Sequence, residues 1–324
     1  MSGMVYHILW WMVCAVSRLP LKVHYRISDG AAFVLHRIVR YRRDTVCANL
    51  ARSFPDLKYG ELKALTREYY RYMCDVIAES LWSAGASDEK ICRVVRTENP
   101  EVMDAVCARH GKVIVMLGHR GNWELIGAVS GENAKQYPGH FSNEPIVLAY
   151  RRIKNKAFDR LMRKMRLRQF SRFRNAGGVV ESGGILRRIL RDDRERGVYM
   201  FIADQSPDPG ERTLVRFLNQ PTFMIGGPEY IARRLGLPVV FLDMERRGRG
   251  DYVIRFTLMT ENAADTEPGF VTREYARLLE RAICGNRSNW LWSHRRWKRI
   301  PTAAEMEKYW KTIEKQIDIK EETL

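Results

Sequence analysis

The residue types best suited to general-base chemistry in this sequence are a histidine and a glutamate five positions apart, His119 and Glu124. A neutral imidazole can take a proton from a hydroxyl group, while a carboxylate holds its tautomer and stabilises the imidazolium that forms. On a continuous helix the two side chains would point about 140° apart, so they would not share a face. We therefore expect His119 in a turn and Glu124 in the first turn of the following helix.

The residues around the pair fit that arrangement. Glycines at positions 118 and 121 flank His119, and Asn122 is a residue type that caps helices. The apolar run Lys112–Leu117 precedes them, and ligands usually bind at the carboxyl ends of strands in α/β sheets. A histidine and a glutamate at this spacing more often form an ordinary capped turn; the strand, the glycines and Trp123 weaken that interpretation, and the chemistry of the residues alone leaves both open.

Apolar runs alternate with helical patterns through the last two thirds of the chain. The predicted strands are Lys112–Leu117, Pro145–Tyr150, Gly197–Ala203 and Pro238–Asp243, with Tyr252–Leu258 as a more alternating edge strand. Helical patterns cover Lys154–Arg168, Gly183–Arg194, Pro228–Leu235 and about Thr272–Ile283. Continuous apolar strands separated by helices predict an α/β fold with a central, mostly parallel sheet flanked by helices.

The N-terminal part has a different texture. Met4–Val16 is an uncharged apolar run whose helix would be about 20 Å long, shorter than the roughly 30 Å hydrocarbon core of a bilayer. Basic residues follow it but none precedes it, so it lacks the charged start of a secretory signal, and the body is expected on the cytoplasmic side. We expect a helical membrane anchor that either spans the bilayer or lies in it. Helices should continue from about Leu19 to Ala84, with a break at Pro55.

No linker separates independent domains, but the hydrophobic pattern and the predicted secondary structure divide the chain into four regions. These are an N-terminal hydrophobic anchor (1–18), a helical membrane-proximal region (19–93), an α/β core (94–300) and a C-terminal tail (301–324).

The charge balance favours an anionic partner. Lys and Arg total 55 against 38 Asp and Glu, a net charge of +17 that suits nucleic acid, an anionic bilayer or an acidic protein. The apolar N-terminus and the lack of a nucleic-acid-binding motif favour the membrane, and a basic nucleic-acid-binding protein remains an alternative. The cysteines show no C-x-x-C pair, and zinc-protease, phosphate-loop and serine-hydrolase motifs are absent, so neither a metal nor a cofactor is expected.

The segment Gly118–Glu124, with the strand before it, resembles the catalytic block of the late lipid A acyltransferases of Gram-negative bacteria, part of the lysophospholipid acyltransferase-like superfamily. Similar blocks follow in the family's order, so that the resemblance covers almost the whole chain. They are Tyr150-Arg151, Asp204-Gln205, Phe223 with Gly226 and Pro228, and the tail Trp290–Lys298. Arg120 and Met224-Ile225 depart from the aromatic residues common in the family, and these departures bear on acceptor and acyl-chain length.

The resemblance implies an acyltransferase-type fold and a role for each matching position. His119 would be the base and Glu124 its partner, and Arg151 would bind phosphate or help to place the acceptor. Asp204 and Gln205 would shape the site, where Asn122 and Gly226 are also expected to contact substrate.

The resemblance also implies the substrates and the location. An acyl carrier protein would supply the acyl group as a thioester, and a hydroxyl of a lipid A precursor would accept it, at an anionic membrane surface on the cytoplasmic face of the inner membrane. A glycerophospholipid, aminolipid or glycolipid acceptor is the closest alternative, and a catalytically silent membrane-binding scaffold is a further one.

Overall fold

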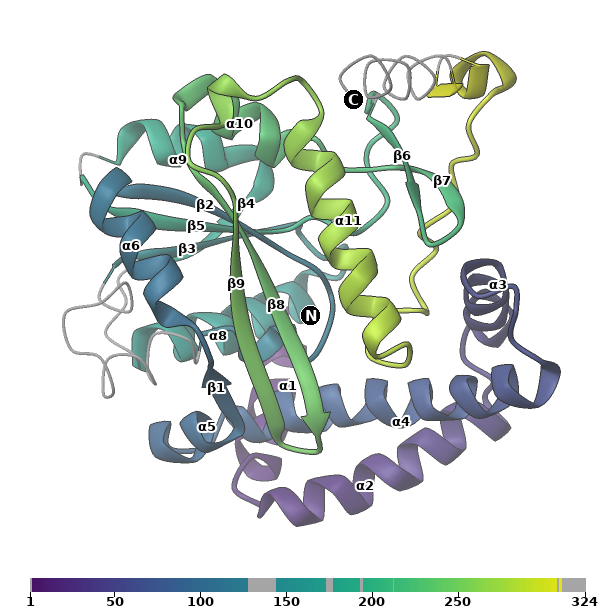
Figure 1. Ribbon diagram of the computed structural model, residues 1–324. Helices are drawn as coiled ribbons and strands as arrows, with labels where there is room; N and C mark the ends of the chain where they lie inside the picture. The colour runs from purple at the N-terminus through teal and green to yellow at the C-terminus, as the bar shows by residue number, and fades with distance from the viewer. Residues whose placement is uncertain are drawn as a thin grey trace.

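The computed structural model describes residues 2–127, 144–172, 177–192, 195–211, 213–307 and 309–310. These residues form a seven-stranded sheet covered by helices, with a separate two-stranded hairpin beside it (Figure 1). The order of strands in the sheet is β1-β9-β8-β2-β5-β3-β4. The strands are β1 (Val95–Thr97), β2 (Lys112–Leu117), β3 (Ile146–Tyr150), β4 (Gly178–Glu181), β5 (Gly197–Ile202), β8 (Val239–Gly248) and β9 (Asp251–Thr260), and the hairpin is β6 (Leu214–Phe217) with β7 (Gln220–Phe223).

The predicted α/β class with a mostly parallel sheet is confirmed. Neighbouring strands pair in parallel except β8 and β9, which form an antiparallel hairpin. The prediction that 252–258 forms an edge strand is wrong, because the short strand β1 pairs in parallel along the outer side of β9. Strands β1, β4, β6 and β7 were not predicted, since each has only three or four residues.

The core explains why the central strands are apolar throughout. On β2, Ile114 and Met116 face one hydrophobic cluster, while Val113, Val115 and Leu117 face another on the opposite side of the sheet. A strand buried on both faces cannot alternate apolar with polar residues. This strand, at the centre of the sheet, is therefore a rigid support for the loop that follows it.

Helices cover both faces of the sheet. The cluster around Ile114 includes residues of α9 (Ile185–Arg191), α10 (Gly227–Leu235) and α11 (Phe270–Gly285). The cluster around Val113 includes residues of α5 (Asp88–Val94) and α6 (Pro100–His110). The helix predicted over 154–168 is α8 (Lys156–Arg172), while residues 193–194 at the end of the predicted helix 183–194 lie outside the described residues, as do residues 311–324 of the tail.

The N-terminal region is helical, as predicted. It contains α1 (Ser2–Val16), α2 (Leu21–Phe33) continued by the π-helical turn η1 (Val34–Ile38), α3 (Arg43–Ser53) and α4 (Tyr59–Ser83), with the chain interrupted around Pro55. Helix α2 lies along α4, and α1 packs against α8 (Figure 1). No single helix among the described residues meets the length and hydropathy expected of a membrane span. The segments Met4–Val16 and Leu21–Ile38 reach this length and hydropathy only as a pair, and the two helices are bent by 119° relative to each other.

Candidate active site

The register of two parallel strands brings His119 and Asp204 together. Leu117 at the end of β2 pairs with Ile202 at the end of β5. His119 and Asp204 each lie two residues beyond this pair, at the same carboxyl edge of the sheet. Parallel pairing in this register therefore places the two side chains side by side, although they are far apart in the sequence.

Asp204 takes part in three hydrogen bonds, two of which hold His119. Its Oδ1 lies 2.5 Å from His119 Nδ1, and its Oδ2 accepts from the backbone nitrogen of His119 at 2.7 Å. The indole Nε1 of Trp290 also donates to Oδ2, at 2.7 Å. Asp204 is 2% exposed, so these donors take the place of water around a buried carboxylate.

The charge state of Asp204 determines the tautomer of His119. Burial alone raises the pKa of the Asp204 carboxyl group, but the charge of His119 and the hydrogen bonds from its ring, its backbone and Trp290 lower that pKa to about 2. An ionised carboxylate only accepts hydrogen bonds, so the proton between Asp204 and His119 belongs to Nδ1. The lone pair of the neutral ring is then on Nε2, the atom on the far side from Asp204.

Nε2 of His119 faces the third predicted block. Gln205 Nε2 lies 3.1 Å from it, in a position to donate a hydrogen bond to the lone pair. The edge of the Trp123 indole packs against the imidazole, with ring centroids 5.1 Å apart. The His119 side chain is 13% exposed, so most of the ring is covered by its neighbours and a small part is accessible.

Glu124 does not take the position beside His119 that the sequence predicts. Its two carboxylate oxygens receive hydrogen bonds from Arg166 Nε and Nη2 on α8, at 2.8 and 2.6 Å. Oε1 also accepts from Trp123 Nε1 at 3.1 Å. Residues 123–125 form a single 3-10 turn rather than an α-helix, and that turn directs Glu124 towards α8. Asp204 is the carboxylate that contacts His119, and Glu124 is connected to the imidazole through Trp123.

Two glycines allow the loop after β2 to take its path. A Cβ atom on Gly118 would lie 2.6 Å from the side chain of Leu279 and 3.2 Å from Asp204 Oδ2. Gly121 has a φ of +62°, and a Cβ atom there would lie 2.3 Å from the backbone oxygen of Met244. A side chain at either position would displace the loop that carries His119.

Asn122 connects this loop to α4. It is fully buried, and its Nδ2 donates to Glu79 Oε2 on α4 at 2.8 Å. Tyr72, also on α4, donates to the backbone oxygen of Gly121 at 2.6 Å. The Asn122 side chain makes no capping hydrogen bond and points towards α4. The predicted capping role is therefore wrong, and the expected contact with substrate has no support in this geometry.

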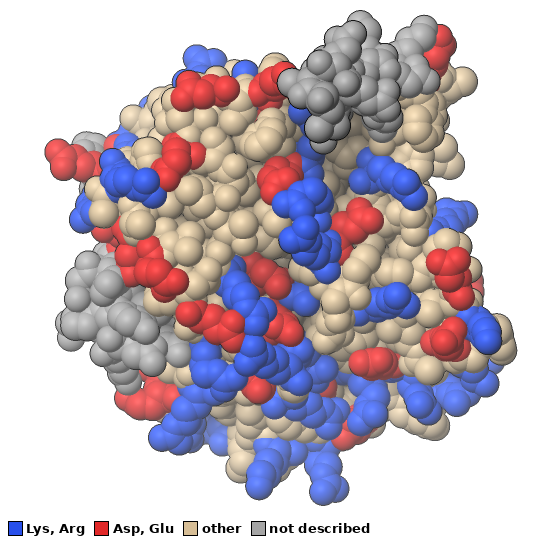
Figure 2. Space-filling model, in the orientation of Figure 1, with Lys and Arg blue, Asp and Glu red and all other residues tan. Residues whose placement is uncertain are grey.

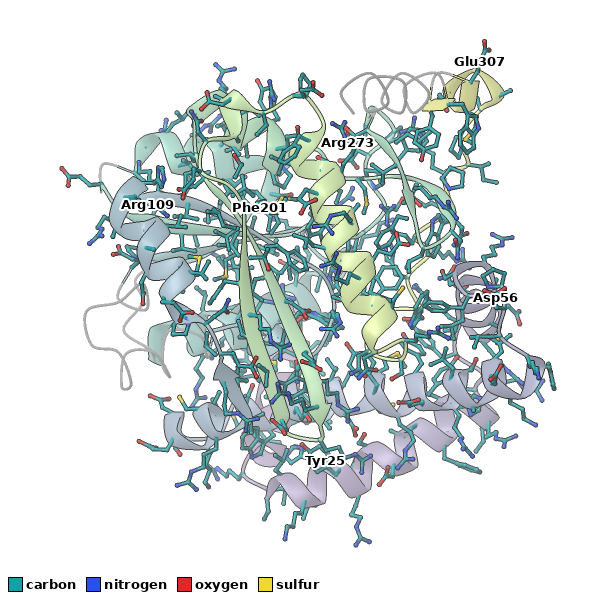
Figure 3. All side chains as sticks on the ribbon, in the orientation of Figure 1. Tyr25, Asp56, Arg109, Phe201, Arg273 and Glu307 are labelled. Carbon is teal, nitrogen blue, oxygen red and sulfur yellow. The ribbon has the colours of Figure 1, made fainter. Side chains whose placement is uncertain are left out.

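A cavity of about 340 Å³ lies beyond Gln205, a size within the usual range of small-molecule pockets, and His119 itself is not among the residues that line it. Gln205 lines it and connects it to His119 Nε2. Its apolar wall includes Phe201, which Figure 3 labels near the centre of the molecule, and Ile225. Arg151 lines it at the end of β3. The second, third and fourth predicted blocks thus meet around one cavity.

Arg151 lines this cavity, whereas Gly226 lies between two residues that line it. The Arg151 side chain is 66% exposed and pairs with Asp208 at 2.8 Å, an ion pair weak enough to be exchanged for a ligand. The backbone nitrogen of Gly226 donates to Glu211 Oε2 at 2.8 Å, and the residues on each side of Gly226 line the cavity. Gly226 therefore shapes the wall through its backbone.

The block Trp290–Lys298 contributes residues near the site that were not among the predicted site residues. Trp290 and Trp292 are 2% and 0% exposed, so neither is available to lie at a membrane interface. Arg296, also buried, donates to the backbone oxygen of Phe223 in the fourth block. Burial lowers the pKa of Arg296 to about 10, which leaves it charged at neutral pH near Asp204. The density of Trp and Arg residues in 290–297 is the sequence feature that could have indicated their position near the site.

The described part of the chain holds no group of three or more His, Cys, Asp or Glu side chains arranged to bind a metal ion. A search of curated proteins finds no match to the chain. The family model for bacterial lipid A biosynthesis acyltransferases matches residues 3–299. The chain therefore belongs to the bacterial lipid A biosynthesis acyltransferase family and is an acyltransferase of lipid A synthesis.

Proposed function

We propose that this enzyme transfers a fatty acyl group from the thioester of an acyl carrier protein to a hydroxyl group of a lipid A precursor, forming an acyloxyacyl ester. The observation that carries the proposal is the pairing of His119 Nδ1 with Asp204, which leaves Nε2 as the basic atom beside the cavity. A hydroxyl acceptor needs a base of this kind, because an alcohol at neutral pH is a poor nucleophile.

The reaction proceeds in two stages. His119 Nε2 removes the proton of the acceptor hydroxyl as its oxygen forms a bond to the thioester carbonyl carbon, and the carbonyl oxygen becomes an oxyanion. The tetrahedral intermediate then collapses, the C–S bond breaks, and the imidazolium returns its proton to the departing sulfur. Asp204 stabilises the imidazolium between the two stages, since its negative charge lies 2.5 Å from Nδ1.

Gln205 and Arg151 are proposed to bind polar groups of the substrates. The Gln205 amide, 3.1 Å from Nε2, can donate to the acceptor oxygen or to the oxyanion once substrate separates it from the ring. Arg151 can exchange Asp208 for a phosphate group, which a guanidinium binds with two parallel hydrogen bonds.

We assign the face formed by α1 and α2 to the cytoplasmic surface of the inner membrane. Trp11 on α1 and Ile38 at the end of α2 and η1 are 72% and 66% exposed, and other apolar side chains at helical spacing lie exposed near them. Lys and Arg gather around α2 and the tip of the β8–β9 hairpin in Figure 2. Apolar side chains flanked by basic ones suit an interfacial helix on anionic lipid.

Acyl transfer by the purified protein tests the proposal. The donors are a series of acyl carrier protein thioesters, the acceptor is a tetra-acylated lipid A precursor, and His119→Ala and Glu124→Ala run beside the wild type. Transfer by the wild type that His119→Ala abolishes, with folding unchanged, would support the base and the acceptor together.

Other outcomes separate the alternatives. If the enzyme transfers acyl groups only to lysophospholipid, aminolipid or glycolipid acceptors, then the acceptor is one of these lipids and not the lipid A precursor. No transfer from any donor to any acceptor would contradict the proposed reaction. In cells, a deletion strain whose lipid A keeps every acyl chain would reject the proposed acceptor.

A further inference from the structure

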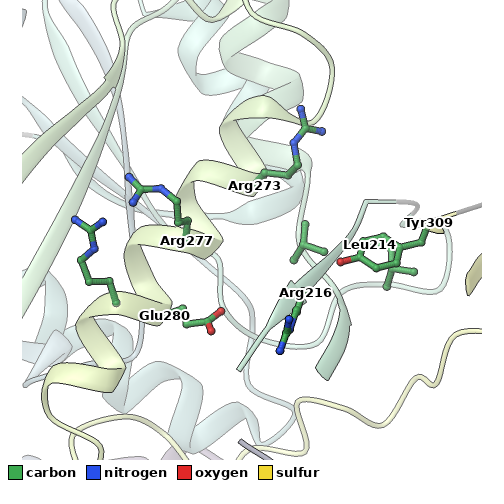
Figure 4. Close-up of a pocket in the computed structure, with 8 residues that line it drawn as sticks. Leu214, Arg216, Arg273, Arg277, Glu280 and Tyr309 are labelled. Carbon is green, nitrogen blue, oxygen red and sulfur yellow. The ribbon is translucent and has the colours of Figure 1, made fainter. Parts of the chain in front are cut away.

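A second concave surface lies between α11 and the β6–β7 hairpin, apart from the active-site cavity. It has a volume of about 460 Å³, and Figure 4 shows the side chains that line it. Leu214 and Val215 form part of its wall. Its charged and polar lining consists of Arg216, Arg273, Arg277, Glu280, Arg281 and Tyr309.

Three of these arginines form a row on one face of α11. Arg273, Arg277 and Arg281 are four residues apart, which places them about 6 Å from one another along the helix. Like charges at this spacing destabilise a helix by about 0.2–0.5 kcal/mol for each pair. The row therefore opposes the folding of the helix that carries it.

Among the described residues, little compensates for this charge. Arg277 forms an ion pair with Glu274 at 2.6 Å. In the part of the chain that the structure describes, no carboxylate lies within ion-pair distance of Arg273 or Arg281. Arg273 makes only a long hydrogen bond of 3.4 Å, to the backbone oxygen of Pro268. Cations that cost helix stability and have no carboxylate partner among the described residues suit an anionic ligand.

The arrangement of the arginines defines the shape of that ligand. In Figure 4 the labelled guanidinium groups of Arg216, Arg273 and Arg277 point in different directions and do not converge on one point. Convergent guanidinium groups would suit a single phosphate. A row about 12 Å long instead matches carboxylates at successive turns of an acidic helix.

The position of the cleft favours a water-soluble protein. In Figure 1 α2 runs along the lower edge of the molecule, whereas β6 and the adjoining part of α11 lie in the upper half. A membrane that contacts the apolar face of α2 would leave the cleft in water. The cleft is also connected to the active site: Phe217 at the end of β6 packs on Trp290, at 5.9 Å between ring centroids, and Trp290 donates to Asp204.

We propose that this cleft docks an acidic helix of the carrier protein that delivers the acyl chain. The proposal rests on the proposed function, which makes a carrier protein the donor. Ion pairs at an exposed docking surface increase the rate of encounter and the specificity for the partner more than they add affinity, so they fit a donor that must leave after each transfer.

The test compares a double charge reversal in the cleft with a matched one elsewhere. Arg273→Glu with Arg281→Glu reverses the two end charges of the row and leaves Arg277 and Glu274 themselves unchanged. Arg187→Glu with Arg191→Glu makes the same change in net charge on α9, where both arginines are exposed and also four residues apart. Each protein is assayed with an acyl carrier protein thioester and with an acyl pantetheine thioester, which presents the same thioester without the protein.

We expect the cleft variant to raise the KM for the carrier-protein donor about tenfold with little change in kcat, since two attractive charges become repulsive. Rates with acyl pantetheine should stay within about twofold, which also reports correct folding. The wild-type KM for the carrier-protein donor should rise with salt, and that rise should be smaller in the cleft variant.

Each contrary result has a distinct meaning. Equal effects of the two double variants would show that net charge alone matters, and equal losses with both donors would show a structural role. Unchanged kinetics with weaker binding to anionic vesicles would assign the cleft to lipid. Any of these overturns the docking proposal while wild-type transfer from the carrier protein stands. Failure of the wild type with every carrier-protein donor would instead reject the proposed donor, and the docking proposal with it.

Discussion

Asp204 holds His119 at two points, through the ring Nδ1 at 2.5 Å and through the backbone nitrogen at 2.7 Å. The same carboxylate thus orients the imidazole and secures the loop that carries it. A carboxylate that contacted only the ring would allow the loop to shift. Both contacts depend on the pairing of β2 with β5, so the geometry of His119 is set by the rigid centre of the sheet.

The first prediction concerns this carboxylate. Asp204→Asn should lower kcat about 10³-fold or more, because an amide cannot stabilise the imidazolium and its N–H2 group favours the wrong tautomer of His119. The fold should persist, since Trp290 and the backbone nitrogen of His119 can still donate to the remaining carbonyl oxygen. Steady-state kinetics and a thermal melt measure the two effects. Activity within tenfold of the wild type would remove Asp204 from the reaction.

The sequence was sufficient to predict the sheet and the position of His119 after a strand, but not the contact of His119 with Asp204. Apolar runs buried on both faces are distinctive, so strands such as 112–117 could be located from pattern alone. The contact between His119 and Asp204 depends on the register between β2 and β5, which no local pattern records. Glu124 was favoured because it is close in sequence, but the 3-10 turn at 123–125 points it elsewhere.

Other parts of the site were hidden for different reasons. Arg166 is one of many basic residues on α8, and only tertiary structure distinguishes the one that binds Glu124. Asn122 has a residue type common at helix caps, yet α4 presents a buried carboxylate, Glu79, that takes its amide. In both cases a contact from a distant helix overrode the local preference.

The second prediction tests what Glu124 does. Arg166→Met leaves the Glu124 carboxylate, 12% exposed, without its cation, so we expect destabilisation of about 3 kcal/mol and a loss of activity. If the ion pair acts by positioning Trp123, then Glu124→Gln should reduce activity to a similar extent as Arg166→Met. The double variant should be little worse than either single variant.

A double-mutant cycle on kcat separates this from direct participation. Should Glu124→Gln abolish transfer while Arg166→Met retains most of it, Glu124 would act on the substrate or on His119 in a conformation that forms with substrate. Arg163→Met, an exposed change on the same helix, controls for the loss of one positive charge.

The third prediction concerns the support beneath the loop. Asn122→Asp brings a second carboxylate against Glu79, which is fully buried, so the two acids should repel and destabilise the fold by about 2 kcal/mol or more. Asn122→Ala removes one donor to Glu79 without adding charge and should cost less. Burial already raises the pKa of Glu79, and the new acid should raise it further. Denaturant unfolding measures the free energy of unfolding of both variants, and Asn122→Asp should be the less stable. Equal stability of the two variants would contradict the prediction.

The fourth prediction is a pH dependence of stability that arises at His294. Desolvation lowers the pKa of His294 from 6.5 to about 4, and its Nδ1 has no hydrogen-bond partner among the described residues. Between pH 6.5 and 4 the unfolded chain binds a proton that the folded chain does not. The free energy of unfolding should therefore fall with decreasing pH across this window, by an amount on the order of 2 kcal/mol for this residue.

His294→Gln removes the titrating group and should flatten the decline. Burial also lowers the pKa of His24 and His36, so part of the acid-side slope should persist in the variant. Urea unfolding of both proteins at pH 8 and at several values down to pH 4.5 measures the slope. The difference between variant and wild type at pH 8 gives the cost of the substitution itself, and only the change in that difference with pH belongs to titration. A difference that stays constant across the range would show that His294 titrates alike in the folded and unfolded chains, and that its burial next to the site carries no pH-dependent cost.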